Sequence, residues 1–161
     1  MARLAGPTQR DIVDAVMTEL RASAALAELV GDRIYSMRAV PGAVAPAADK
    51  ETPYLDVTIG DTTSTRNGYC DSTWFEVVFE VRFGGVVSCY DDDDEGWDAI
   101  EITEACKTIV YSSATLMRLV KQWNIGQEPA LRLAREQGGA KIAVSLMSLT
   151  CTYDVRYSIG A

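Results

Sequence analysis

Residues 73–83 read TWFEVVFEVRF, and the alternation in this stretch decides the fold class. Successive side chains of a β-strand point to opposite faces, so every second position shares a face. Here the odd-numbered positions are all apolar: Phe75, Val77, Phe79, Val81 and Phe83. A uniformly apolar face on a strand of this length must be buried against other elements. We therefore predict a long strand with its odd-numbered face in the core.

The even-numbered face of the same stretch has a different composition. It mixes charged and apolar side chains: Trp74, Glu76, Val78, Glu80 and Arg82. Such a mixture predicts a face that lies on solvent or against a partner. We take these five residues as the candidate interface with a neighbouring subunit.

Apolar residues at helical spacing predict two helices before this strand and one after it. The first spans residues 8–22 and begins near Thr8, and a second short helix begins at Ser23 and ends at Gly31. The third follows the long strand, with apolar residues at helical spacing from Ala99 to about Ser112. Residues 116–120 fit either a strand or a continuation of this helix. The expected core combines helix and strand positions: Ile12, Val16, Leu20, Phe75, Val77, Phe79, Val81, Ile102, Cys106 and Ile109.

Further strands and loops follow from alternation and from proline and glycine. Residues 54–60 alternate and predict a strand, and residues 130–136 and 141–157 predict two strands of a hairpin. We expect loops where prolines or polar residues gather, and an end or bend of the long strand at Gly84-Gly85. These expected loops span 39–53, 61–68 and 122–129.

The order of these elements predicts one α+β domain over residues 1–161. Its antiparallel sheet of long strands is expected to be covered by helices on one face. A chain of 161 residues is long enough to bury a sizeable core without disulfides or metals.

The composition excludes several classes of function. The net charge is −8, which argues against a surface that grips nucleic acid or an anionic membrane. There is no histidine in the chain, which removes His-based catalysis and most zinc sites. No membrane span or signal peptide is apparent, so we expect a protein of the cytoplasm with reduced cysteines. We expect no enzyme, no cofactor and no bound metal.

An acidic run follows the long strand: Asp91, Asp92, Asp93, Asp94 and Glu95. It does not match a calcium-binding loop, because the twelfth position from Asp91 is Ile102, which cannot ligate a cation. A solvent-exposed loop that leads into the next helix is the expected structure. Weak cation binding and a role facing a polyelectrolyte remain as alternatives.

With the elements placed, two segments carry a resemblance to a known family. Residues 24–35 read AALAELVGDRIY, and residues 52–61 read TPYLDVTIGD. Together with the element order over nearly the whole chain, they resemble the tail-terminator (tail-completion) proteins of long-tailed bacteriophages and related gene-transfer particles. The segments LVGDRIY and PYLDV are the specific parts of the resemblance.

The resemblance implies a structural virion protein with a fold similar to that of tail-tube subunits. Such a protein forms a homo-hexameric ring at the head-proximal end of the tail tube and stops tube polymerisation. It then presents a joining surface to the neck and head-tail connector proteins, while double-stranded DNA passes through the lumen without sequence-specific binding. Its place is the neck end of the virion tail, after assembly in the host cytoplasm.

Within that interpretation, neighbours in the ring or the tube would cover the even-numbered face of the long strand. The acidic run would lie in the lumen, on the outer rim or against a basic partner surface. Two other interpretations remain open. One is another neck component, such as a head-completion or stopper protein, and the other is a small ligand-binding or regulatory module.

Overall fold

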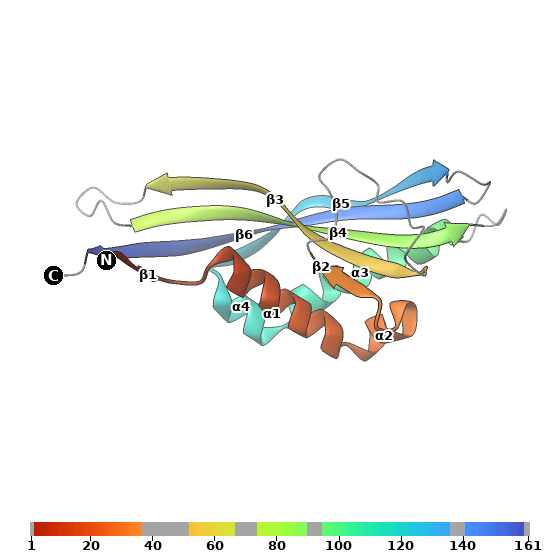
Figure 1. Ribbon diagram of the computed structural model, residues 1–161, viewed down its shortest axis with the longest axis horizontal. Coiled ribbons are helices and arrows are strands. Elements are labelled where there is room, and N and C mark those ends of the chain that lie inside the picture. The colour runs from red at the N-terminus through yellow and green to blue at the C-terminus, as the bar shows by residue number, and fades with distance from the viewer. Residues whose placement is uncertain (1, 37–51, 67–73, 90–94, 136–140, 160–161) are drawn as a thin grey trace.

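The computed structural model of the protein describes residues 2–36, 52–66, 74–89, 95–135 and 141–159. Long strands follow the longest axis of the molecule, and the described helices lie together on one face of the sheet (Figure 1). This arrangement confirms the predicted α+β class. The strands are β1 (Ala2–Ala5), β2 (Ile34–Ser36), β3 (Tyr54–Arg66), β4 (Trp74–Cys89), β5 (Gln122–Arg135) and β6 (Lys141–Ile159). The helices are α1 (Gln9–Ala22), α2 (Ala24–Val30), α3 (Glu95–Ser112) and α4 (Ala114–Leu119).

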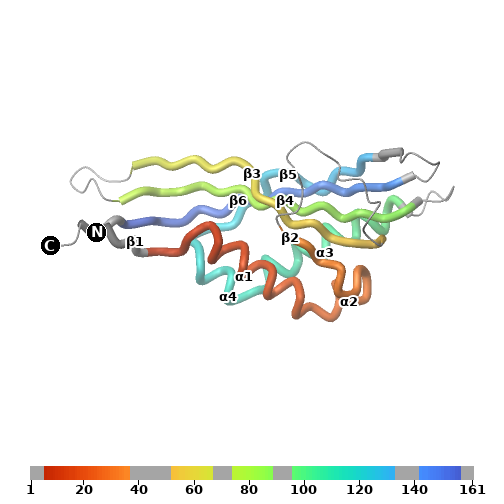
Figure 2. Tube along the Cα trace, in the orientation of Figure 1, coloured from red at the N-terminus to blue at the C-terminus, as the bar shows by residue number. Residues whose placement is uncertain are grey.

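Strand β6 is the centre of the sheet. On one side it pairs with β4 over residues 141–156, and β3 and then β2 follow. On its other side β5 pairs with residues 141–152 and β1 pairs with residues 156–159, so β5 and β1 share one edge end to end. The trace in Figure 2 shows these strands running side by side.

The sheet is antiparallel, as predicted, except for one pair. Strand β2 runs parallel to β3, with Ile34 opposite Leu55 and Ser36 opposite Val57. A parallel pair needs a connection that crosses over, and residues 37–53 are long enough to supply one. The sheet is therefore mixed.

The first two helices begin and end where the sequence indicates. The Thr8 hydroxyl accepts the Asp11 amide at 3.1 Å, and the Asp11 carboxylate accepts the Thr8 amide at 2.8 Å, which forms a capping box. The bond from the Thr8 amide, and a second bond from the Thr8 hydroxyl to the same carboxylate, hold the pKa of Asp11 below its usual range. Ser23 caps α2, and Gly31 ends it with φ +63°, a conformation that favours glycine.

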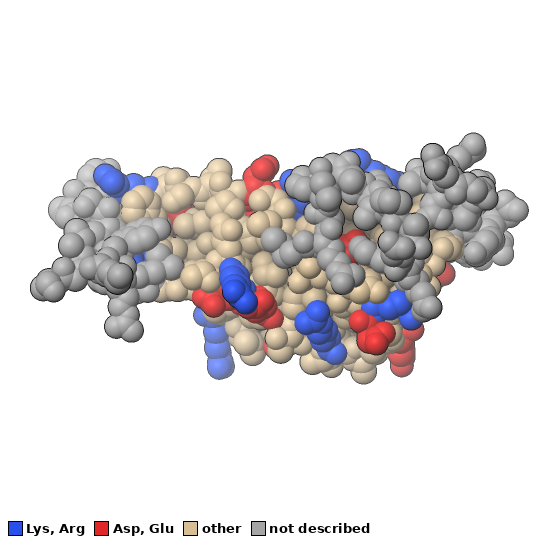
Figure 3. All heavy atoms as spheres, viewed as in Figure 1, with Lys and Arg blue, Asp and Glu red and all other residues tan. Residues whose placement is uncertain are grey.

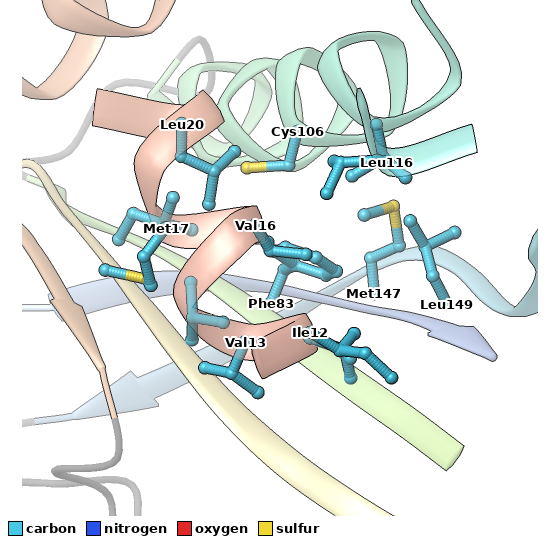
Figure 4. Close-up of a cluster of buried hydrophobic side chains, with 14 of the residues drawn as sticks. Ile12, Val13, Val16, Met17, Leu20, Phe83, Cys106, Leu116, Met147 and Leu149 are labelled. Carbon is cyan, nitrogen blue, oxygen red and sulfur yellow. The ribbon is translucent and has the colours of Figure 1, made fainter. Parts of the chain in front are cut away.

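The core lies between the helices and the face of the sheet that carries the odd-numbered β4 side chains, which we call the inner face. Side chains of α1, α3 and α4 meet those of the sheet there (Figure 4). Eight of the ten predicted core residues are buried, whereas Phe75 and Ile109 are half-buried. Phe75 lies near the start of β4, in the part of the sheet that extends past the helices.

Three strands are longer than predicted. Residues 61–66, expected as a loop, continue β3, because Thr62–Arg66 pair with Phe79–Phe75 of β4 after a register shift. Strand β4 continues through Gly84 and Gly85 rather than ending there. The connector expected at 122–129 is the first half of β5, and Pro129 is tolerated because β5 is an edge strand with irregular register.

Two other elements, α4 and β1, were left open or not predicted by the sequence. Residues 114–119 form α4, so the ambiguous apolar run is helical up to Leu119. Strand β1, which the sequence pattern does not predict, pairs with the end of β6. Most of the expected loop at 39–53 and the hairpin turn at 137–139 lie outside the described residues.

Candidate interaction surface on the sheet

The five predicted interface residues lie together on the outer face of the sheet, which is the face opposite the helices. Their alternation along β4 places them there, and the cross-strand register aligns them with Arg156, Asp154, Thr152, Thr150 and Ser148 of β6. Trp74, Glu76, Val78 and Glu80 are half-buried and Arg82 is exposed. The prediction that the odd face is buried and the even face is not is therefore confirmed.

Glu80 and Arg82 pair with each other on this face. The Arg82 guanidinium lies 3.2 Å from the Glu80 carboxylate, and the Asp61 amide donates to the same carboxylate at 3.2 Å. The Arg82 hydrogen bond holds the pKa of Glu80 below its usual range, despite partial burial. Gly60 of β3 leaves room for this pair, because a Cβ at that position would overlap the Glu80 carboxylate.

Glu76 and Asp154 stand directly opposite each other on β4 and β6, which alone would be repulsive. Lys121 offsets this, because its Nζ donates to Glu76 at 3.1 Å and to Asp154 at 3.2 Å. The two carboxylates raise the pKa of Lys121. Lys121 precedes β5, so the interaction also ties the start of that strand to the two central strands.

Trp74 lies beside Arg156 of β6, with the guanidinium carbon 5.4 Å from the ring centroid. This is a cation–π arrangement. Sequence reasoning missed Asp154 and Arg156 because only the β4–β6 register brings them to this face. It also missed Lys121, which is held beside β6 by the bond from its amide to the Thr152 carbonyl. A surface whose charges are paired in this way attracts no single sign of partner. Its chemistry is hydrogen bonding and apolar contact through residues such as Trp74 and Val78.

The other end of the outer face is apolar and buried. Tyr54, Val86, Ile142 and Val144 form a second cluster there, with Tyr35 and Leu146 packed against it. The rings of Tyr35 and Tyr54 meet edge to face at 5.9 Å. The outer face therefore has a polar half, centred on Val78 and Glu80, and an apolar half, centred on Val86.

The acidic run is described only at its end. Glu95 is the first residue of α3, and Asp91–Asp94 lie outside the described residues, so its predicted roles stay predictions. Within the described ranges, no group of three or more Cys, Asp or Glu side chains is arranged to hold a metal ion. In the view of Figure 3, acidic and basic side chains alternate along the helix layer.

Two of the four cysteines are described in full, and both are free thiols in the core. Burial raises the pKa of Cys106 far above its usual range and that of Cys151 to about 12. The prediction of reduced, buried thiols is confirmed for these two. Cys70 and the Cys89 side chain lie outside the described part. Among the helices that the structure describes, none is long and apolar enough to cross a bilayer.

No protein-family model matches the chain, and no curated protein matches its sequence. A similar solved structure is a chain from the virion of a native gene transfer agent particle, with 18% identity and a TM-score of 0.39. The similarity covers 85% of this chain and 91% of that chain.

Proposed function

We propose that this protein is a structural virion protein that forms a ring at the head-proximal end of a phage tail tube. The ring ends tube polymerisation and provides the joining surface to the neck, and double-stranded DNA passes through its lumen. The observation that carries the proposal is the polar half of the outer face. It holds a half-buried tryptophan and valine among paired charges, on a sheet whose described helices all cover the opposite face.

The sequence resemblance supports the same proposal, and its two specific segments fold against each other. LVGDRIY contributes β2 and PYLDV opens β3, and these strands form the parallel pair. The Arg33 side chain donates to the Pro53 carbonyl at 2.7 Å, and the Leu55 amide donates to the Arg33 carbonyl at 3.0 Å. The two segments therefore build one junction of the sheet.

Under this proposal the protein is not an enzyme and needs no cofactor. Its partners are other copies of itself, the tube protein and the neck proteins. The acidic composition fits a ring that DNA traverses, because a chain with net charge −8 repels phosphate and gives the DNA no basic surface to bind.

The proposal is tested by changing the polar half of the outer face without disturbing the core. Trp74→Ala and Val78→Asp should leave the fold intact, since neither side chain is in the core, and should give tails of uncontrolled length. Electron microscopy of particles measures the lengths, and circular dichroism with thermal unfolding of the purified variants verifies the fold. Glu104→Ala, on the exposed side of α3, is the matched control and should give normal tails. Normal tails from both outer-face variants would contradict the proposal.

The second candidate, a head-completion or stopper protein, differs in position rather than in fold. A fusion tag or a bound antibody fragment, imaged on whole particles, locates the protein along the axis. Density at the tube end supports a terminator, whereas density within the head vertex supports the neck alternative. A chain that is absent from particles and sediments as a monomer would favour the ligand-binding or regulatory module.

A further inference from the structure

One cross-strand row runs across the inner face of the sheet from β3 to β5. Ile59 of β3 is paired with Val81 of β4, Val81 with Leu149 of β6, and Leu149 with Ile125 of β5. The row therefore contains four aliphatic side chains at one level along the strands. Its two central members are fully buried beneath the helices.

The two ends of this row are exposed. Ile59 is 37% exposed and Ile125 is 41% exposed, although both are large aliphatic side chains on the core side of the sheet. They lie on opposite edges of the molecule, Ile59 beside α1 and Ile125 beside α3. Apolar side chains of the inner face are therefore exposed on both flanks of the molecule, the β3 side and the β5 side, at the same level along the strands.

The surroundings of the two ends differ in shape. Beside Ile59 there is a groove of about 370 Å³ between α1 and β3, lined by Gln9, Arg10, Val13, Asp14, Ser36 and Ile59. On the other flank Tyr111 of α3 lies over β5, is 43% exposed and donates its hydroxyl to the Trp123 carbonyl at 3.2 Å. We call the two exposed side chains of this flank, Ile125 of β5 and Tyr111 of α3, the apolar knob, and the opposite flank offers a hollow.

Both flanks also carry a pair of opposite charges. Arg10 and Asp14 lie 3.6 Å apart at the groove, and Lys107 and Glu128 lie 2.9 Å apart beside the knob. Lys107 is one helical turn from Tyr111, and Glu128 follows Ile125 on β5. Contact between the flanks would let each cation meet the carboxylate of the other pair.

Main-chain pairing between the two edges is disfavoured at this level. The register of β3 shifts between Ile59 and Thr62, and that of β5 shifts after Ile125 and again before Ala130. Pro129 removes one further amide donor from β5. Irregular edges of this kind oppose strand addition, so a contact here is made by side chains.

We infer that Ile125 and Tyr111 of one copy of this chain pack into the Ile59 groove of the next copy. The two surfaces differ, so the contact is head to tail. Two joined copies therefore leave one knob and one groove free for further copies. Because both ends of the row lie at one level, successive copies can be related by rotation without a step along the axis, which closes a ring. The inference deepens the proposed function by naming the contact between subunits, and only the position of the ring on a tail rests on that proposal.

Cysteine crosslinking tests the contact directly on the purified full-length chain. Ile59→Cys protein mixed with Ile125→Cys protein should give covalent dimers with a short bismaleimide, and the double variant should give a ladder of larger species. Ile59→Cys with Leu131→Cys is the matched control. Leu131 is on the same strand and 42% exposed, but it pairs with Ser145, which lies opposite Gly85, at another level. All of these proteins also carry Cys70→Ser and Cys89→Ser, because the side chains of these two native cysteines lie outside the described residues. The Leu131 mixture and the chain with only the two serine substitutions should give no dimers.

The outcomes separate this inference from the proposed function. No dimer from the Ile59 and Ile125 mixture, equal dimer from the Leu131 control, or dimers of either single variant with itself would overturn the contact. Sedimentation adds a second readout, in which Ile125→Asp should dissociate the oligomer and Leu131→Asp should not. If crosslinks form but the chain is absent from tails, the contact stands and the tail role fails. If Trp74→Ala disturbs tail length but no crosslinks form, the tail role stands and the contact fails.

Discussion

The hydroxyl of Thr103 on α3 lies 2.8 Å from the hydroxyl of Ser145 on β6, and both residues are fully buried. Thr103 also donates to the Ile100 carbonyl at 2.9 Å. A hydroxyl has one proton, so Ser145 must be the donor to Thr103. This directed pair joins α3 to the central strand β6 inside the core.

The direction of that bond predicts unequal effects of removing its two partners. Thr103→Val leaves the Ser145 hydroxyl buried without its acceptor and should lower the free energy of unfolding by about 1–3 kcal/mol. Ser145→Ala leaves Thr103 bonded to Ile100 and should cost about 0.5–1.5 kcal/mol. Denaturant unfolding of both variants and of the double variant measures the difference. The double variant should cost less than the sum, and additive values would contradict the coupling.

Gly85 and Gly84 are neighbours in β4 with opposite tolerance for a side chain. A Cβ at Gly85 would lie 2.8 Å from the Ala99 carbonyl oxygen and 3.0 Å from Ile102 Cβ, so α3 could not keep its position. Gly85→Ala should therefore destabilise the fold by about 1–3 kcal/mol. At Gly84 the nearest atom to a Cβ would be Leu146 Cδ2 at 3.6 Å, an ordinary contact. Gly84→Ala should change stability by less than about 0.5 kcal/mol, and equal effects in thermal unfolding would refute this reading of the helix contact.

Alanine substitutions at Phe79 and Val78 test which face of the sheet is buried in the core. Phe79 is fully buried on the inner face, and Phe79→Ala should cost about 3–5 kcal/mol through lost burial and the cavity left behind. Val78→Ala removes a half-buried side chain on the outer face and should cost clearly less in the free chain. Chemical denaturation of the two variants gives the comparison. A larger loss for Val78→Ala would mean that the core lies on the other face.

The Glu80–Arg82 pair predicts a dependence of stability on pH. Arg82 holds the pKa of Glu80 below the ordinary value of 4.5, so the pair stabilises the fold above that value and the effect is lost as pH falls through the folded pKa. Arg82→Met should raise the pKa of Glu80, observable by NMR titration of its carboxyl carbon. Because the Arg82 side chain is 50% exposed, solvent screens the pair, so the loss of stability near neutral pH should not exceed about 1 kcal/mol and should vanish in acid. A variant that is destabilised equally at every pH would show that lost packing, not charge, is responsible.

Local pattern was sufficient for α1, α2 and α3, for the buried face of β4 and for most of the core. Thr8, Ser23 and Gly31 mark helix ends because caps depend on neighbouring residues alone. The alternation over 73–83 identified the buried face correctly, because that face is apolar at every position.

What local pattern could not predict is decided by partners distant in sequence. Residues 61–66 are polar, yet they are strand because β4 is long enough to pair with them. Pro129 indicated a loop, but an edge position beside β6 tolerates it. The ion pairs of the outer face and the exposed ends of the Ile59–Ile125 row likewise exist only once the register is set.

The pairing of β1 with the end of β6 has a consequence for how the chain reaches its native state. Residues 2–5 have their hydrogen-bond partners at residues 156–159, so this pairing joins segments that lie more than 150 residues apart in the sequence, and closing so long a loop is slow. The helix that follows β1 can form early from its own capping box, but the strand before it cannot. The β1 amides should therefore be late to gain protection in a pulse-labelled refolding experiment.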